Sequence, residues 1–308
     1  MATHKSLHPE LIGLVEALQA APPLSQLPVP VLRQMMREQW LDPNAPAEVA
    51  TRNIAISVEG GTIPARLYVP ADAPALTPGV IFFHGGGFVF GDLDSHDGAC
   101  RRLCRASGVR IIAVDYRLAP EHPMPAAHDD ALAAARWVFN HAEQLGFDRG
   151  RIGVCGDSAG ALLAASTAFV LRSDPVCRIK TQTLIYPVLM LGGTTPSRQT
   201  FAAGPILDAA TIEYFTRCYL GSGNDDDERL NLLGADLTDM PPTTLVIAGL
   251  DPLQDEGRSF GRRLVEHGVT VSTLEFGTLP HGFVTLSHLS PAVGDVVAEI
   301  GTRLGAWL

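Results

Sequence analysis

A serine between glycines is the residue of this sequence best suited to nucleophilic chemistry. The segment Gly156-Asp157-Ser158-Ala159-Gly160 has the form G-x-S-x-G, and it lies between a β-rich run at 151–155 and an apolar helical pattern at 159–171. A nucleophile must protrude from a strained strand-to-helix turn, and small flanking residues leave space for that turn. The helix N-terminus behind it also favours negative charge. The pattern therefore predicts that Ser158 is a catalytic nucleophile.

A second glycine cluster could supply hydrogen-bond donors to such a nucleophile. His84-Gly85-Gly86-Gly87-Phe88 follows the apolar run at 80–83, and consecutive glycines let the backbone approach a substrate. We expect the N–H groups of Gly86, Gly87 and Ala159 to form an oxyanion hole. A phosphate loop is the alternative, but no Lys-Ser or Lys-Thr pair follows the glycines. We expect His84 to order this loop by hydrogen bonds, since it precedes the nucleophile in sequence.

The acid of a serine triad must follow the nucleophile, at the end of a strand. Asp251 stands just past the β-branched run at 243–248, in a loop that begins Asp251-Pro252. Asp255 and Glu256 come a few residues later, in an expected helix where acids commonly serve as caps. The order and the strand end therefore favour Asp251 as the acid.

Three histidines follow Asp251 and could complete the triad. His267 precedes Gly268 at an expected helix end, where the helix dipole favours a cation and a structural role. His281 lies in the loop after the last strand run, from which an imidazole can reach Ser158. His288 lies further along and is expected at the surface. The sequence therefore predicts His281 as the base.

Composition narrows the class of partner. The net charge of -10 argues against a nucleic-acid or anionic-membrane surface, because both require a basic patch. No apolar run approaches the roughly 20 residues of a membrane span, so no stable membrane insertion is expected. The N-terminus lacks the apolar stretch of a secretory signal. These features indicate a small-molecule partner.

The cysteines bear on compartment and on metal binding. The five cysteines are odd in number and irregularly spaced, which suits reduced, buried thiols and a cytoplasmic location. Cys100 and Cys104 lie four residues apart on an expected helix, but no second Cys or His pair follows at ligand spacing. We therefore expect neither a metal nor another cofactor.

Short β-rich runs alternate with helical patterns from residue 54 onward. This alternation predicts an α/β fold, a mostly parallel eight-stranded sheet flanked by helices. The expected strands are 54–58, 63–69, 80–83, 110–114, 151–155, 181–186, 243–248 and 269–276. The expected helices between them are 97–106, 126–144, 159–171, 255–267 and 291–307.

Two segments break this alternation. Residues 1–45 contain two helical stretches, and residues 192–228 contain a Gly/Thr/Pro loop followed by a helical stretch at 209–220. We expect these segments to form a helical cap on a core made of residues 46–191 and 229–308. Several apolar residues of the cap could line an acyl site or simply pack on the core: Leu11, Val15, Leu18, Met35, Met36, Ile206, Leu207 and Phe215.

These motifs together resemble those of the hormone-sensitive-lipase-like esterases, also called bacterial family IV. The matching segments are 84–88, 116–123, 156–160, 251–257 and 281–283, and the resemblance extends from about residue 66 to the C-terminus. It implies an α/β-hydrolase fold with a helical cap, and cofactor-free hydrolysis of short to medium acyl esters through Ser158, Asp251 and His281.

Other functions on the same scaffold are left open by the residues. An amidase or a lactonase would use the same acyl chemistry and would differ in leaving-group protonation and pocket shape. A non-catalytic ligand receptor is a further alternative, but the presence of His281 and the complete oxyanion loop favour an enzyme. The sequence also leaves open whether the chain forms a homo-oligomer.

Overall fold

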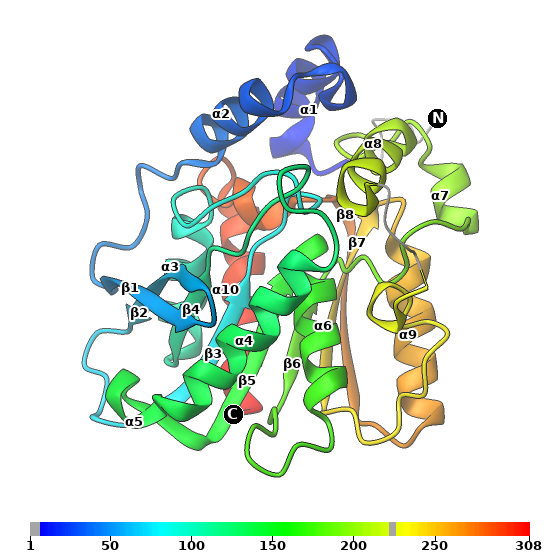
Figure 1. Cartoon of the computed structure of the whole chain (residues 1–308). Helices are drawn as coiled ribbons and strands as arrows, with labels where there is room; N and C mark the ends of the chain where they lie inside the picture. Colours follow the sequence, from blue (N-terminus) through cyan, green and yellow to red (C-terminus); the bar gives the residue numbers. More distant parts are fainter. Residues whose placement is uncertain (1–6, 222–225) are drawn as a thin grey trace.

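The computed structural model describes residues 7–221 and 226–308, and one eight-stranded sheet forms its centre (Figure 1). The strand order is β1-β2-β4-β3-β5-β6-β7-β8. β2 is antiparallel to both of its neighbours, and the other pairs are parallel, as predicted for a mostly parallel sheet. The strands are β1 (Ala50–Val58), β2 (Gly61–Val69), β3 (Thr77–Phe83), β4 (Arg110–Val114), β5 (Phe147–Asp157), β6 (Gln182–Ile185), β7 (Thr243–Leu250) and β8 (Val271–Pro280).

The central strands are buried on both faces because helices cover both sides of the sheet. Along β3, Val80 and Phe82 pack into one hydrophobic cluster, while Ile81 and Phe83 pack into the other. Alternate side chains of a strand point to opposite faces, so an uninterrupted apolar run is what a doubly covered strand requires. This is why the run at 80–83 is apolar at consecutive positions.

Two layers of helices sandwich the sheet. α3 (Asp97–Ser107) and α10 (Pro291–Ala306) pack together on one face, and α4 (Ala126–Asn140), α6 (Ala159–Leu171) and α9 (Gln254–Glu266) cover the other (Figure 1). The single helix expected at 126–144 is wrong, because His141 leaves helical geometry (φ -116°, ψ 16°) and separates α4 from the short α5 (Ala142–Leu145). The short 3-10 turns are η2 (Pro9–Leu11), η3 (Leu24–Gln26), η4 (Glu228–Leu230) and η5 (Phe283–Leu286).

Four further helices lie beyond the carboxyl ends of the central strands. α1 (Ile12–Ala20) and α2 (Val29–Trp40) come from the N-terminal segment, and α7 (Pro196–Thr200) and α8 (Ala209–Leu220) follow β6 (Figure 1). Helix α7 lies in a segment predicted as a loop. Its signal is local: Thr195 caps the helix by accepting the Arg198 N–H, and Pro196 occupies the first turn.

Helix α2 is tied to the core through Arg33. Its guanidinium makes two hydrogen bonds to Glu121, of 2.9 and 2.7 Å, and donates to the carbonyl oxygens of Val89 and Ala119 at 2.8 and 3.0 Å. Paired N–H donors on a carboxylate fix orientation as well as distance. The N-terminal helices are therefore held directly against the loop that follows β3.

Among the helices of the described ranges, none combines the length and apolar character needed to cross a membrane.

Candidate active site

Ser158 occupies the turn between β5 and α6 with a strained backbone. Its φ is 54° and its ψ is -118°, a conformation that costs free energy for a residue with a side chain. Gly156 and Gly160 are required on either side of Ser158 because neighbouring backbone atoms lie too close to leave room for a Cβ atom. A Cβ atom on Gly156 would lie 2.3 Å from the Gly160 carbonyl oxygen, and one on Gly160 would lie 2.0 Å from the Phe83 carbonyl oxygen. The turn can therefore form only with glycine at both positions.

The structure brings Ser158, His281 and Asp251 into one hydrogen-bonded row. The Ser158 Oγ atom lies 2.8 Å from His281 Nε2, and His281 Nδ1 lies 2.7 Å from Asp251 Oδ2. Asp251 is fully buried, and its second oxygen accepts the Leu253 N–H at 2.8 Å. A carboxylate only accepts hydrogen bonds, so the proton of a neutral His281 belongs on Nδ1. Nε2 is then free to accept the Ser158 proton.

The glycine loop after β3 approaches Ser158 with an unusual backbone. Gly86 has φ 116° and Gly87 has φ 60°, values that favour glycine. Across the described residues, the N–H groups of Gly86, Gly87 and Ala159 donate to no protein acceptor. Gly86 and Gly87 line the same cavity as Ser158 and His281. Their N–H groups are therefore available to a ligand in that cavity.

Asp157, next to Ser158, holds the base of this loop. Its carboxylate accepts the Gly85 N–H at 2.8 Å and the Tyr186 hydroxyl at 3.3 Å, and His96 Nε2 lies 3.4 Å away. Burial alone would raise the pKa of Asp157, but His96 and the Gly85 N–H outweigh burial and lower it. Asp157 therefore stays ionised and links the glycine loop to the nucleophile turn. This link was not predicted from the sequence, although an acid directly before Ser158 was a visible signal.

His84 orders the same loop, as expected. Its Nδ1 lies 2.7 Å from the Gly85 carbonyl oxygen, and its ring stacks on Tyr116 with centroids 4.3 Å apart. Burial, and next the neighbouring His96, lower the pKa of His84 to about 4. His84 is therefore neutral near pH 7 and lies outside the Ser158 row.

Helix α8 packs on the outer side of the glycine loop. A Cβ atom on Gly87 would lie 2.3 Å from the Phe215 ring, so the helix and the loop are in close contact. One helical turn later, the Tyr219 ring stacks on Phe88 at a centroid distance of 3.9 Å. The Tyr219 hydroxyl lies 2.6 Å from Nδ1 of the buried His128. A displacement of α8 would therefore displace the loop that carries Gly86 and Gly87.

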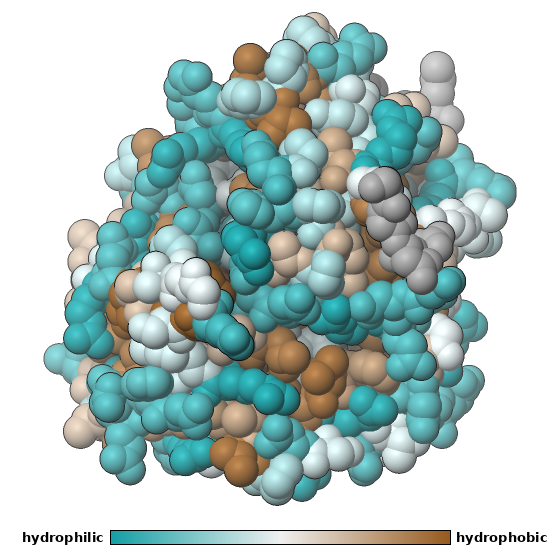
Figure 2. Space-filling view, viewed as in Figure 1, coloured by the Kyte–Doolittle hydropathy of each residue, from teal (hydrophilic) through white to brown (hydrophobic). Residues whose placement is uncertain are grey.

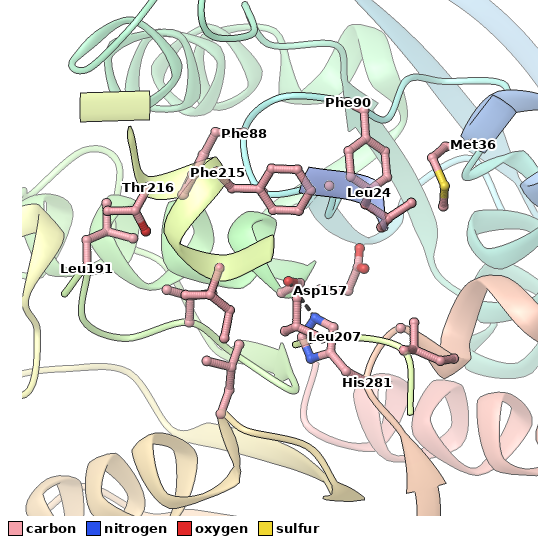
Figure 3. A pocket seen from close by; sticks show the side chains of 18 of the residues that line it. Leu24, Met36, Phe88, Phe90, Asp157, Leu191, Leu207, Phe215, Thr216 and His281 are labelled. Carbon is pink, nitrogen blue, oxygen red and sulfur yellow. Dashed lines mark hydrogen bonds between the residues drawn. The ribbon is translucent and has the colours of Figure 1, made fainter. Parts of the chain in front are cut away.

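The cavity above Ser158 has a volume of about 90 Å³ and is mostly apolar (Figure 3). Both of the segments expected to form a cap reach it: Leu24, Met36 and Trp40 from the first, and Ile206, Leu207 and Phe215 from the second. Of the other apolar residues proposed for an acyl site, Leu11 and Val15 are fully buried in the hydrophobic core instead.

Asp255 and Glu256 act differently from the expected helix caps. Asp255 accepts the Ser197 N–H at 2.8 Å, and the fully buried Glu256 pairs with Arg198 at 2.6 Å and accepts the Leu189 N–H at 3.0 Å. Burial raises the pKa of Glu256 although Arg198 opposes that change. Both acids thus hold the segment after β6, which also places Arg198 in the cavity wall. This role depends on contacts that local sequence does not show.

The remaining sequence expectations concern histidines and cysteines. His267 ends α9 and its Nδ1 lies 2.7 Å from the Arg263 carbonyl oxygen, a structural role as expected. His288 is half-buried, so the expectation of a surface position is wrong. The five thiols are free, and burial raises the pKa of the Cys104 thiol to about 12. The described part of the chain contains no cluster of three or more His, Cys, Asp or Glu side chains able to hold a metal ion.

Comparison with known proteins identifies the family. A model of the α/β-hydrolase fold family matches residues 80–285, which is more than half of the chain. The chain belongs to the α/β-hydrolase family. Among curated relatives, the esterase LipI of Mycobacterium tuberculosis is 41% identical over 272 residues, covering 87% of this chain and 85% of that protein. The ethyl acetate hydrolase of Pseudomonas putida is 40% identical over 236 residues, covering 75% of this chain and 74% of that protein.

Solved structures of esterases superpose closely on this chain. A hyperthermophilic esterase from Pyrobaculum calidifontis superposes with a TM-score of 0.91 at 35% identity, covering 97% of this chain and 98% of that one. A thermostable esterase from Pseudomonas putida gives a TM-score of 0.94 at 29% identity, covering 100% and 99%. The predicted α/β-hydrolase fold and the resemblance to hormone-sensitive-lipase-like esterases are therefore confirmed.

Proposed function

We propose that this α/β-hydrolase is a serine carboxylesterase that cleaves esters of short to medium acyl chains, with Ser158 as nucleophile, His281 as base and Asp251 as acid. The observation that carries the proposal is the hydrogen-bonded row Ser158–His281–Asp251. The esterases among its relatives and structural neighbours support the same activity.

In the first step, His281 Nε2 takes the proton of the Ser158 hydroxyl while Oγ attacks the ester carbonyl carbon. The carbonyl oxygen becomes an oxyanion, which the N–H groups of Gly86, Gly87 and Ala159 stabilise. Each such donor lowers the barrier by about 2.7–4 kcal/mol. Asp251 keeps the His281 proton on Nδ1 and stabilises the imidazolium that forms.

In the second step, the tetrahedral intermediate collapses. The bond from carbon to the alcohol oxygen breaks, and His281 Nε2 returns its proton to that oxygen. Water then attacks the carbonyl carbon of the acyl-enzyme while His281 Nε2 accepts a proton from it. The bond between that carbon and Ser158 Oγ breaks, His281 returns the proton to Oγ, and the carboxylic acid leaves. The reaction uses the side chains already present and consumes only water and ester.

The direct test is turnover of p-nitrophenyl butyrate by the wild type, Ser158→Ala and Ser166→Ala. Ser166 is a matched control, because it is a buried serine on α6 whose hydroxyl donates to the Leu163 carbonyl oxygen. Ser158→Ala should lose at least about a thousandfold in kcat, while Ser166→Ala should stay near the wild type. Near-normal turnover by Ser158→Ala would overturn the assignment.

Esters rather than amides are proposed as the substrates. The relatives named above are esterases or ester hydrolases, and the cavity beside His281 is mostly apolar. Matched butyrate esters and butyranilides test this point. A higher kcat/KM for the anilide would favour the amidase alternative.

We also propose that the enzyme works in the cytoplasm on a small-molecule ester, without nucleic acid. The net charge of -10 and the five free thiols support this location. Fractionation of the native producing cells, with detection by antibody, tests it. Recovery in the secreted or the membrane fraction would contradict it.

A further inference from the structure

A second cavity adjoins the one above Ser158. It has a volume of about 370 Å³, against about 90 Å³ for the cavity that holds Ser158. We call it the outer cavity. Its walls come from α1, from α2 with the connection that precedes it, and from the loop 203–208 before α8. The residues that line both cavities form a shared wall: Leu24, Met36, Trp40, Ile206 and Gly282.

The outer cavity suits a hydrocarbon group. Leu18, Pro22, Met35 and Leu286 supply apolar surface away from the shared wall. Its one acidic side chain among the described lining residues, Asp208, already accepts the Thr211 N–H at 2.7 Å as the cap of α8. None of the described lining residues is a lysine or an arginine. An apolar group gains about fourfold in binding for each methylene that it buries there.

The position of His281 decides which half of an ester faces the outer cavity. His281 Nε2 must return its proton to the alcohol oxygen, so the alcohol half departs on the His281 side of Ser158. Gly282, directly after His281, lines both cavities, and Leu286 of η5 lines the outer one. The outer cavity therefore opens on the side where the alcohol leaves.

The acyl half has a different set of neighbours. Val188, Leu191, Leu253 and Phe215 line only the cavity above Ser158 and none of the outer cavity. Figure 3 shows Leu24 and Met36 on one side of His281, with Leu191 and Thr216 on the other. The acyl half is thus confined to the cavity of about 90 Å³ above Ser158, whereas the alcohol half can extend into the outer cavity of about 370 Å³.

We propose that the outer cavity binds the alcohol half of the ester, and that the preferred substrates join a bulky hydrophobic alcohol to a short acyl chain. The proposal rests on the proposed function, because it assigns the two halves of the ester that Ser158 cleaves. Hydrophobic side chains among the hydrophilic ones are visible over α1 and α2 in Figure 2, the region that bounds the outer cavity.

Two matched ester series test the proposal. The first keeps butyrate as the acyl half and lengthens the alcohol from methanol to octanol. The second keeps methanol and lengthens the acyl half from acetyl to octanoyl. Rates are followed by acid release, so that no aromatic leaving group occupies the outer cavity. In the wild type, kcat/KM should rise by about twofold to fourfold for each added methylene of the alcohol. In the acyl series it should reach a maximum and then fall.

Substitutions in each cavity provide the controls. Leu18→Trp and Met35→Trp each narrow the outer cavity at a half-buried position that does not line the catalytic cavity. Both should lower kcat/KM for octyl butyrate by at least tenfold and leave methyl butyrate within about twofold of the wild type. Leu191→Trp should have the opposite effect, lowering methyl octanoate hydrolysis more than octyl butyrate hydrolysis.

The outcomes are distinguishable. If Leu18→Trp and Met35→Trp both reduce the acyl series and spare the alcohol series, the assignment of the two halves is wrong. If both folded variants leave both series unchanged, the outer cavity binds neither half and the proposal fails. If the wild type hydrolyses no member of either series, the proposed esterase function itself has failed.

Discussion

Replacement of Gly87 by alanine should disable the proposed oxyanion hole through a clash with helix α8. Gly87 has φ 60°, and an alanine there costs about 1–2 kcal/mol in backbone strain. The added Cβ atom would also lie 2.3 Å from the Phe215 ring, although carbon atoms in contact prefer about 3.5–4 Å. Either the loop or α8 must therefore shift by more than about 1 Å.

The kinetic consequence follows from the loss of aligned N–H donors. Loss of one donor raises the barrier by about 2.7–4 kcal/mol, so Gly87→Ala should lower kcat by about a hundredfold to a thousandfold. KM should change much less, because the apolar walls remain. Steady-state kinetics on p-nitrophenyl butyrate, with circular dichroism to check folding, measure both quantities.

A double substitution separates the clash from other effects. Phe215→Ala removes the ring atoms that lie 2.3 and 2.5 Å from the new Cβ atom and leaves the contact with the Cβ atom of residue 215 at 2.9 Å. Gly87→Ala/Phe215→Ala should therefore recover at least tenfold in kcat over Gly87→Ala, measured against Phe215→Ala alone. Gly86→Ala is the contrast, because its Cβ atom would lie 2.0 Å from the Phe90 carbonyl oxygen, which Phe215→Ala does not remove. Wild-type kcat in Gly87→Ala, or equal rescue of both glycine variants, would refute this reasoning.

Three further perturbations have defined outcomes. Asp251→Asn should lower kcat by about ten-thousandfold with little change in melting temperature, because an amide facing His281 favours the wrong tautomer; a loss below tenfold in steady-state kinetics would contradict this. Burial, and next Arg229, lower the pKa of His128 to about 3, so below about pH 6.5 only the unfolded state binds that proton. His128 should therefore account for about 2 kcal/mol of the stability lost between pH 7 and pH 5 in urea denaturation, and this loss should be smaller by that amount in His128→Gln than in the wild type, in which His84 also contributes to it. Glu256→Gln should cost about 3–5 kcal/mol in the free energy of unfolding, because it leaves the largely buried Arg198 cation unpaired; an unchanged urea midpoint would argue against that pairing.

Local sequence patterns predicted those helices and strands whose bounds are indicated by residues within the element or next to it. β4, α6 and α8 have the bounds that the sequence predicted. For α8 the local signals are plain, because Asp208 caps its start by accepting the Thr211 N–H and Gly221 follows its last residue. The residues named for catalysis, Ser158 and His281, lie within hydrogen-bond distance because each follows a strand whose carboxyl end meets the same edge of the sheet. The order of the motifs along the chain, each at the end of a strand, was therefore enough to predict that Ser158 and His281 lie together.

The features that the sequence did not predict depend on contacts between distant residues. Asp157 reaches Gly85 across 72 positions, and Glu256 reaches Arg198 across 58. Glu256 had a local explanation as a helix cap, Asp157 had no assigned role, and only the folded arrangement shows their partners. The outer cavity likewise arises from segments at 18–40 and 203–211, whose apolar residues were equally compatible with plain packing.

The most direct test of the central claim is to locate a covalent adduct on the nucleophile. The enzyme would be incubated with a p-nitrophenyl alkylphosphonate, and intact mass followed by peptide mapping would measure the stoichiometry and the site. We predict one phosphonyl group per chain, on Ser158, appearing in step with loss of esterase activity and absent from Ser158→Ala. Labelling of a different residue, or complete inactivation without an adduct on Ser158, would contradict it.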